Sequence, residues 1–410
     1  MLDKGSARFA LGLLLCVNLV NYLDRQVLYS LLPLIQTDLS LNDAQAGWLA
    51  SAFMLVYMIA APPIGYLADR GGRKLWIAGG IALWSLATAG SGLAATYAQL
   101  FFARAAVGIG ESCYGSISPS FVAEHFPANE RGWVLALFSM AIPVGSALGY
   151  VAGGSIGQAW GWRKAFWVVG IPGLILAALA LKLREPRETS PHEGKASRSD
   201  AVSGYLKLFR IPSFTLVTLA GAAMTYALGG LAVWMPSFFH RTWGLSVGQA
   251  GTLFGGITVV SGIIGSLAGG WLADWGLKFN SRSYFIVSGT GLLVGMPLAI
   301  YSVLAGSLHS AIAFIFLAEF FVFLNMGPLN AIIISVTDQK SRSMAFAANI
   351  FIIHALGDAI SPAIIGSVSD RVGLKAALIG ALSALGAASA FCLWGAKHYD
   401  ADLAKAQANA

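Results

Sequence analysis

Long runs of apolar residues, separated by short polar segments, recur along the whole chain. They lie at about 9–34, 44–68, 75–94, 97–123, 132–156 and 164–183, and after a polar gap at 212–239, 248–273, 284–305, 309–336, 344–367 and 375–396. An α-helix needs about 20 apolar residues to cross the hydrocarbon core of a bilayer. The pattern therefore predicts twelve membrane-spanning helices, six on each side of a hydrophilic connection.

The polar gap divides the chain into two similar parts. Residues 184–211 are rich in Arg, Glu, Pro, Ser and Lys, a composition typical of a solvated linker. We predict an all-α membrane protein with an N-terminal six-helix bundle at 1–183 and a cytoplasmic linker at 184–211. A C-terminal six-helix bundle follows at 212–396, and a cytoplasmic tail at 397–410.

The composition supports a membrane protein. Hydrophobic residues make up 57% of the chain and charged residues only 11%, whereas a soluble domain has about 25% charged residues. The first apolar run continues to about Pro33 and has no small-residue cleavage site, so we read it as a retained helix rather than a signal peptide.

The basic residues are distributed unevenly between the two sides of the predicted membrane. If the N-terminus is cytoplasmic, 19 of the 26 Lys and Arg residues lie on the cytoplasmic side and five on the other. This bias predicts that both termini are cytoplasmic. It also accounts for most of the net charge of +7 without a nucleic-acid partner.

A short motif recurs at equivalent junctions between predicted helices. Its copies are 65–74 between the second and third helices, 270–274 between the eighth and ninth, and 366–375 between the eleventh and twelfth, with a fainter relative at 157–164. Each copy occupies the second junction of a three-helix unit, on alternating sides of the membrane. This is the arrangement expected of inverted repeats within two halves of a transporter.

Two predicted helices carry charged residues far from their ends. Arg104 and Glu111 are seven residues apart, so they project from one face of the fourth helix, roughly 10 Å apart along its axis. Asp24 and Arg25 lie within the first apolar run. Charges at this depth usually face a cavity or a partner, because a charge in hydrocarbon costs at least about 2.5–3.5 kcal/mol.

The motifs resemble those of the major facilitator superfamily over essentially the whole length. Residues 65–74 match its signature between the second and third helices, and Arg104 with Gly108 and Gly110 resembles its fourth-helix motif. The glycines of the fifth helix resemble its packing motif; they are Gly145, Gly149, Gly153 and Gly154. Residues 21–25 (Asn-Tyr-Leu-Asp-Arg), 108–114 and 141–150 are similar to the Spinster family of lipid transporters.

The resemblance implies a bacterial inner-membrane homologue that transports lysophospholipid or sphingosine-phosphate type substrates, with protons as the coupling ion. We predict no cofactor. We assign proton coupling to Asp24, Glu111 and Arg104. Burial raises the pKa of a carboxyl group and a nearby arginine lowers it, so a carboxylate that exchanges arginine partners can take up and release a proton. We expect Asp24 to meet Arg104, and Glu111, on the same helical face as Arg104, to compete for it. The alternative is a static ion pair that holds the two helices together.

Candidate substrate-binding residues come from both halves. Arg25 shares a helical face with Asn18, Tyr22 and Tyr29, and could hold a phosphate or carboxylate; alternatively it packs against a neighbouring helix. The further candidates are Tyr114, Glu319, Asn325, Asn349 and His354. His354 and Asp358, four residues apart, could pair on one helical face. For this pair an interhelical hydrogen bond and substrate contact are equal possibilities.

Residues at the membrane edge predict a conformational latch, in which carboxylates cap helix ends and pair with arginine in one state of the cycle. They are Gly65, Asp69, Arg70, Gly72, Arg73 and Asp274. We predict no metal site and no catalytic residues, because no nucleotide-binding loop or hydrolase motif occurs. The alternative function is a proton-coupled symporter of water-soluble organic anions such as sugar acids. We expect a monomer whose partners are the substrate and membrane lipids.

Overall fold

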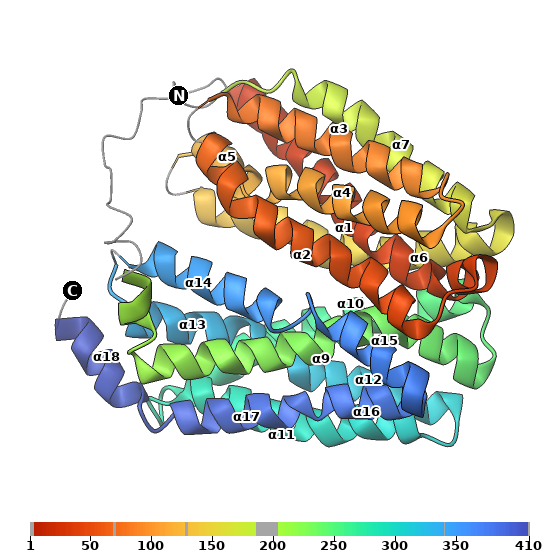
Figure 1. The fold of residues 1–410 in the computed structure, drawn as a ribbon. Coiled ribbons are helices and arrows are strands. Elements are labelled where there is room, and N and C mark those ends of the chain that lie inside the picture. The colour runs from red at the N-terminus through yellow and green to blue at the C-terminus, as the bar shows by residue number, and fades with distance from the viewer. Residues whose placement is uncertain (1–3, 69–70, 128–129, 186–203, 340, 409–410) are drawn as a thin grey trace. The chain divides into compact units, whose positions relative to one another are not determined.

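All regular elements that the structure describes are helices (Figure 1). The computed structural model describes residues 4–68, 71–127, 130–185, 204–339 and 341–408. Each of the twelve predicted spans coincides with one helix or with two consecutive helices. The prediction of an all-α fold of twelve spans is confirmed.

The first six spans comprise seven helices. They are α1 (Lys4–Leu39), α2 (Asp43–Ala68), α3 (Arg73–Ser91), α4 (Tyr97–Gly115), α5 (Ser118–Glu124), α6 (Arg131–Trp160) and α7 (Trp162–Ala180). The last six spans comprise nine helices, and a further helix follows them. They are α9 (Pro212–Trp243), α10 (Val247–Gly276), α11 (Ser283–Leu304), α12 (Leu308–Phe323), α13 (Met326–Val336), α14 (Arg342–Ala355), α15 (Ser361–Val372), α16 (Leu374–Leu382) and α17 (Ala384–Gly395), followed by α18 (Tyr399–Ala408).

Several spans are interrupted. The fourth span breaks between α4 and α5, and the eleventh between α14 and α15, where Figure 1 shows an irregular joint. In both cases the second helix has a proline in its first turn, Pro119 and Pro362. Proline is tolerated there because the first helical N–H groups have no partner within the helix. Among the described residues, nine helical stretches are long and apolar enough to cross a membrane; α3 and the two spans interrupted by these prolines account for the rest.

The backbone supports the internal repeat. Gly161 joins α6 to α7 with φ 86° and ψ 156°, and Gly373 joins α15 to α16 with φ 84° and ψ 153°. Both glycines therefore have the same backbone conformation, at the last junction between spans in their halves. A positive φ of this kind favours glycine, which has no Cβ. The recurrence of glycine at these junctions thus has a physical reason.

The chain forms two compact units, residues 1–192 with 232–256, and residues 193–231 with 257–410. The end of α9 and the beginning of α10 therefore pack with the first unit. In that unit α1 and α6 make a close contact: a Cβ on Gly145 would lie 2.5 Å from the carbonyl oxygen of Leu19. Small residues allow two helix backbones to approach in this way.

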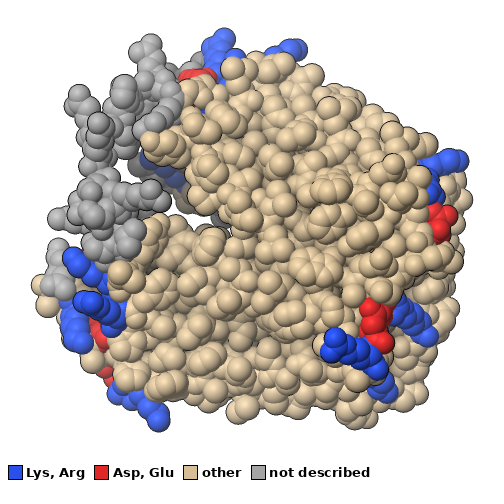
Figure 2. Space-filling model, in the orientation of Figure 1, with Lys and Arg blue, Asp and Glu red and all other residues tan. Residues whose placement is uncertain are grey.

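The surface is that of a membrane protein. Figure 2 shows a face that is almost free of charged side chains, which lie at its margins. Large apolar side chains point outward from several helices; Phe102, Ile175 and Leu267 are 70%, 62% and 72% exposed. Such side chains are stable when they face lipid.

The predicted C-terminal tail begins with a docked helix. Asp402 is 4% exposed, and its Oδ2 accepts a hydrogen bond of 3.0 Å from the backbone N–H of Ser213, in the first turn of α9. Arg282 donates from Nε to Oδ2 of Asp400 at 2.6 Å. These contacts hold α18 against the second unit.

Candidate functional site

Four charged side chains meet between α1 and α4 inside the first unit. We call Asp24, Arg25, Arg104 and Glu111 the charge quartet. Asp24 and Arg104 are each 1% exposed and Glu111 is 0% exposed. The structure thus brings together the three residues assigned to proton coupling, and it adds Arg25, which we had assigned to the substrate.

The quartet forms two ion pairs across the two helices. Arg104 Nη1 lies 3.5 Å from Asp24 Oδ1, and Arg25 Nε lies 2.6 Å from Glu111 Oε2. Thr88, on α3, donates a hydrogen bond to the other oxygen of Asp24. The expected meeting of Asp24 and Arg104 is confirmed. Glu111, however, pairs with Arg25, whereas we had expected it to compete for Arg104.

Aromatic rings from α1 and α2 surround Arg25. Its Cζ lies 4.9 Å from the ring centroids of both Tyr22 and Phe53, and 5.4 Å from that of Tyr57. The faces of these rings attract a cation, more strongly where water is excluded. Rings and carboxylate together hold the guanidinium in place, so in this arrangement Arg25 is engaged rather than free for a substrate.

Some polar atoms of the quartet are buried without a hydrogen-bond partner among the described residues. They are Nε of Arg104 and Oε1 of Glu111. An unsatisfied buried group costs about 1–3 kcal/mol, so buried groups of this kind often mark a functional site. The quartet therefore retains one donor and one acceptor for a proton or an anion.

The other predicted substrate residues of the first half have structural hydrogen bonds. Asn18 Nδ2 donates to the carbonyl of Phe138 on α6 at 2.9 Å, and the hydroxyl of Tyr114 donates to the carbonyl of Leu14 at 2.7 Å. Tyr29 is half-buried on α1. Asn18 and Tyr114 therefore tie α1 to its neighbours in this arrangement.

The remaining predicted substrate residues belong to the second unit. His354 Nδ1 lies 2.8 Å from Asp358 Oδ1, which confirms the expected pairing of these two side chains. Asn325 Nδ2 donates to the carbonyl of Val322 at 2.9 Å within its own segment. Asn349 is buried on α14. Glu319, also buried, lies within hydrogen-bond distance of two hydroxyl groups of α10.

The predicted latch is partly described. Gly72 has φ 48° immediately before α3, and Gly65 lies within α2. Asp69 and Arg70 lie outside the described residues. The hydroxyl of Tyr284 donates to Asp274 Oδ1 at 3.0 Å.

Arg73 forms the main contact at this junction. Its Nη1 and Nη2 donate to the two carboxylate oxygens of Glu124 at 3.0 and 2.7 Å, and its Nε lies 3.7 Å from Glu185. The backbone N–H of Lys74 also donates to Glu185, at 2.7 Å. Our sequence analysis missed Glu124 and Glu185. The signal was available, since both are acidic residues at the ends of the fourth and sixth spans, on the predicted cytoplasmic side.

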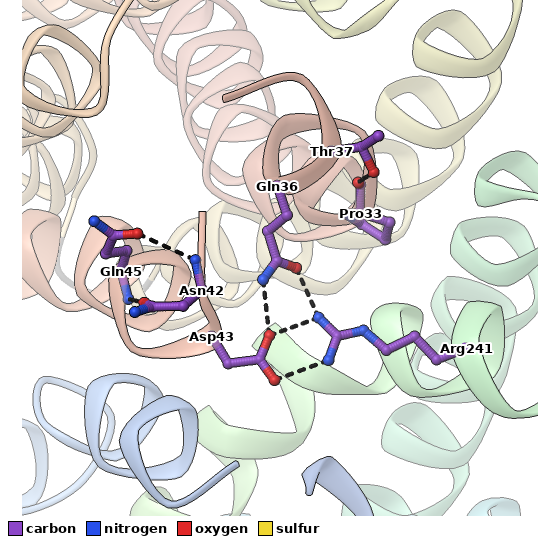
Figure 3. Close-up of polar contacts among 7 residues, drawn as sticks. All are labelled: Pro33, Gln36, Thr37, Asn42, Asp43, Gln45 and Arg241. Carbon is purple, nitrogen blue, oxygen red and sulfur yellow. Dashed lines mark hydrogen bonds and ion pairs between the residues drawn. The ribbon is translucent and has the colours of Figure 1, made fainter. Parts of the chain in front are cut away.

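A second polar cluster was also missed. We call Gln36, Asp43 and Arg241 the outer clasp; it joins the ends of α1 and α9 to the start of α2 (Figure 3). Arg241 donates to the two oxygens of Asp43 at 2.8 and 2.6 Å, and to Oε1 of Gln36 at 2.8 Å. Gln36 donates from Nε2 to Asp43 at 2.7 Å. Planar two-point contacts of this kind are among the stronger hydrogen bonds in proteins.

The start of α2 is fixed independently of Arg241. Asn42 Oδ1 accepts a hydrogen bond from the N–H of Gln45 at 2.8 Å, and Gln45 Oε1 accepts one from the N–H of Asn42 at 3.1 Å (Figure 3). This reciprocal pattern is a capping box. It holds the backbone beside Asp43 in place.

A neighbouring ion pair joins helices of the first half only. Arg163 Nη1 lies 2.6 Å from Asp38 Oδ2, and Trp162 Nε1 donates to the same oxygen at 3.2 Å. It connects the end of α1 to the start of α7. Among the described residues, no group of three or more His, Cys, Asp or Glu side chains could hold a metal ion.

Comparisons with known proteins agree with this architecture. Residues 14–362 match the family model of the Major Facilitator Superfamily. The chain is 34% identical over 397 residues to protein spinster homolog 1 of Homo sapiens, covering 90% of this chain and 74% of that protein. It is 32% identical over 386 residues to the sphingosine-1-phosphate transporter SPNS2 of Xenopus tropicalis, covering 90% and 75%.

The fold matches that of a solved bacterial protein. A crystal structure of a bacterial homolog to the human lysosomal transporter Spinster, in an inward-facing and unoccupied conformation, has a TM-score of 0.86 at 23% identity. The match covers 98% of this chain and 99% of that one. Fold and relatives identify a multi-pass integral membrane transporter rather than an enzyme. The chain belongs to the Spinster family of the major facilitator superfamily.

Proposed function

We propose that this protein transports a lipid-derived or amphipathic anion by alternating access, driven by protons. Lysophospholipids and sphingosine phosphate represent the substrate class. The observation that carries the proposal is the charge quartet, in which two carboxylates and two arginines are paired inside the membrane-spanning part of the chain. Ionisable groups at such depth are costly and are usually retained for function.

The quartet offers a mechanism of coupling by competition. While Glu111 is ionised, it occupies Arg25 through a contact of 2.6 Å. A proton on Glu111 removes its charge and weakens its hold on the guanidinium, which is then able to bind a phosphate or carboxylate at two points. Protonation and anion binding therefore favour each other, because both replace the same ion pair.

Asp24 and Arg104 form a second ion pair between the same two helices, and a proton on Asp24 would weaken it in the same way. Asp24 keeps the Thr88 hydroxyl as a second partner, so it does not depend on Arg104 alone. The contact with Arg104 is 3.5 Å, longer than that between Arg25 and Glu111. We therefore assign the first exchange of partners to Arg25 and Glu111, and the second to Arg104.

Alternating access requires contacts that break in each cycle. The outer clasp joins the end of α9 to α1 and α2 within the first unit. We assign to it the contact that opens when α9 moves away from α1 and α2 on the outer side. The Arg73 contacts with Glu124 and Glu185, with the rest of the predicted latch, serve the inner side in the same way. When these contacts are broken, the charged side chains are solvated at the membrane edge, and the loss of free energy is small.

We propose that the protein lies in a bacterial inner membrane with both termini in the cytoplasm. The distribution of Lys and Arg supports this orientation. The outer clasp then faces the periplasm. We propose a monomer as the functional unit, since one chain supplies both pseudo-symmetric halves that alternating access needs.

Transport into proteoliposomes tests the proposal. With sphingosine-1-phosphate as the probe and an imposed pH gradient, wild-type protein is expected to give saturable, gradient-dependent flux that Asp24→Asn and Glu111→Gln abolish. Asp38→Asn removes a carboxylate at the membrane edge and should leave the flux unchanged. Flux that remains gradient-dependent in both intramembrane variants would reject the coupling role. Flux of a sugar acid, without flux of sphingosine-1-phosphate or of a lysophospholipid, would replace the proposed substrate class with the alternative of water-soluble organic anions.

A further inference from the structure

Glu319 is a buried carboxyl group outside the charge quartet. It lies on α12 in the second unit, near the middle of a span formed by α12 and α13, and is 2% exposed. Thr258 Oγ1 lies 3.1 Å from its Oε1, and Ser261 Oγ lies 2.9 Å from its Oε2. Both hydroxyl groups come from α10.

Close packing of α10 against α12 produces this arrangement. A Cβ on Gly265 would lie 2.5 Å from the carbonyl oxygen of Phe320, and one on Gly262 would lie 3.5 Å from the ring of Phe323. Because glycine lets the backbones approach, the short side chains of Thr258 and Ser261 reach the carboxyl group. The contact surface leaves little room for a substrate beside Glu319, so the structure does not favour the substrate contact that we expected.

Among the described residues of α10 to α13, no charged group faces Glu319. The only ionisable residue of α10 is Asp274, 16 residues along the helix from Thr258. Besides Glu319, the only ionisable residue of α12 is His309, 10 residues along the helix from Glu319. At 1.5 Å per residue, these separations are roughly 24 and 15 Å. α11 contributes only Tyr284 and Tyr301, near its two ends, and α13 has no ionisable residue. Among the described residues, Glu319 forms no ion pair.

A count of hydrogens indicates that Glu319 is a neutral acid. The Ser261 hydroxyl has one hydrogen, and the carbonyl oxygen of Ile257 lies closer to it, at 2.7 Å, than Oε2 of Glu319 does. If the hydroxyl donates to Ile257, it accepts from Glu319, which requires a proton on Oε2. Thr258 then donates to Oε1, and every polar atom has a partner. An ionised Glu319 would instead be a buried charge with no cation, a costly arrangement.

We propose that Glu319 is a second proton-binding site of the transporter. It is protonated while it lies between Thr258 and Ser261, and it releases the proton when α10 and α12 separate and water reaches it. This inference rests on the proposed proton-coupled function and assigns a carboxyl group of the second half to it. Since its partners are hydroxyl groups, it responds to protons and water and not to an anionic substrate.

Infrared spectroscopy of the reconstituted protein tests the protonation directly. The carbonyl stretch of a protonated carboxyl group is separate from the bands of carboxylates. At neutral pH, the spectrum of Glu319→Gln is expected to lack one protonated-carboxyl band of the wild type, and Ser261→Ala should shift that band. Asp402→Asn is the matched control: Asp402 is buried but accepts a backbone N–H and lies 3.8 Å from Lys405 Nζ, so its removal should leave the protonated-carboxyl region unchanged.

The infrared outcomes decide the first half of the proposal. No difference between wild type and Glu319→Gln at neutral pH would overturn it, because Glu319 would then be ionised. A band that keeps its full intensity up to strongly alkaline pH would also overturn it, because Glu319 would be a fixed structural acid. Loss of the band on titration to alkaline pH would support a site that exchanges its proton.

Transport separates this inference from the proposed role of the quartet. With sphingosine-1-phosphate as the probe, Glu319→Gln is expected to lose the difference in flux between acid and alkaline pH, while Glu319→Asp keeps part of it. An unchanged pH profile in Glu319→Gln would overturn the second site and leave the quartet standing. Loss of pH dependence in Glu319→Gln, with coupling retained in Asp24→Asn and Glu111→Gln, would support the second site and reject the quartet.

Discussion

Removing the charge of Asp43 should shift the protein toward an arrangement that is open on its outer side. The substitution Asp43→Asn keeps the size of the side chain but removes its negative charge and one of the two oxygens that accept hydrogen bonds from Arg241, now 2.8 and 2.6 Å long. The capping box of Asn42 and Gln45 stays in place, so the start of α2 should remain helical. The expected effect is on the contact with α9.

The burial of the pair sets the magnitude. The side chain of Arg241 is 36% exposed and that of Asp43 is 11% exposed. Fully exposed pairs contribute about 0.2–1 kcal/mol, and breaking a buried pair costs about 3–5 kcal/mol. An intermediate loss of about 1–2 kcal/mol shifts a two-state equilibrium by roughly 5- to 30-fold, since about 1.4 kcal/mol is a factor of ten.

Distances between spin labels measure the shift. Labels at Thr37 on α1 and Thr242 on α9, in a background without native cysteines, report the separation of the two outer ends. Asp43→Asn is expected to increase the population of the longer distance, and Arg241→Gln should do the same. The double variant should add little, because each single change already removes the pair.

Asp38→Asn is the matched control, since it removes an ion pair of similar length between α1 and α7, within the first half. It should leave the distance distribution unchanged. The reasoning is refuted if Asp43→Asn keeps the wild-type distribution. It is equally refuted if Asp38→Asn shifts that distribution as far, because the clasp would then have no special role in opening.

Two further predictions concern stability. Gly145→Ala should lower the melting temperature by the equivalent of about 1–3 kcal/mol, because the added Cβ would lie 2.5 Å from a backbone oxygen of α1. Gly79→Ala on α3 is the control and should leave the melting temperature unchanged, since no atom lies within 4 Å of its added Cβ. Equal losses in the two variants would contradict the packing role of Gly145. Hydrogen bonds from Ser281 and Arg282 lower the pKa of Asp400 from its ordinary value of 3.8. The contribution of Asp400 to holding α18 should therefore be complete above pH 3.8 and be lost as the pH falls through the folded-state pKa, while Asp400→Asn removes this dependence. Mobility of a spin label on α18 measures it, and an unchanged acid profile in the variant would contradict the assignment.

The twelve spans were predictable because bilayer thickness sets their length and because lipid requires an apolar surface. The breaks in the spans were less predictable. Pro119 and Pro362 lie in the first turn of a helix, but a proline inside a span, such as Pro143 in α6, also occurs without ending the helix. Proline therefore marks a possible break, and neighbouring helices decide whether it occurs.

The charged residues of the site were also predictable, but their pairing was not. A charge inside an apolar run is visible in the sequence, and helical spacing shows which charges share a face. The choice of Arg25 as the partner of Glu111 depends on the rotation of α1 against α4, and on rings from α2 such as Phe53 and Tyr57. These rings look like ordinary apolar residues in the sequence.

The outer clasp had no usable signal in a single sequence. Asp43 and Arg241 are 198 residues apart, and each lies at the end of a helix, where charged residues are common. Their pairing depends on tertiary structure alone. The hydroxyl partners of Glu319 are similar, since serine and threonine are frequent in membrane helices and usually bond to their own backbone.

The chemical difference between the quartet and Glu319 bears on the order of events in a cycle. An arginine that leaves its carboxylate can be captured by an anion, so proton binding at Glu111 should depend on substrate concentration. Glu319 has no cation that an anion could capture, so its protonation should depend on access of water between α10 and α12. Substrate-dependent proton uptake, measured with a pH-sensitive dye in weakly buffered detergent solution, should therefore disappear in Glu111→Gln and persist in Glu319→Gln. Uptake that disappears only in Glu319→Gln would show that the anion acts on the second half, and that competition for arginine is not the source of coupling.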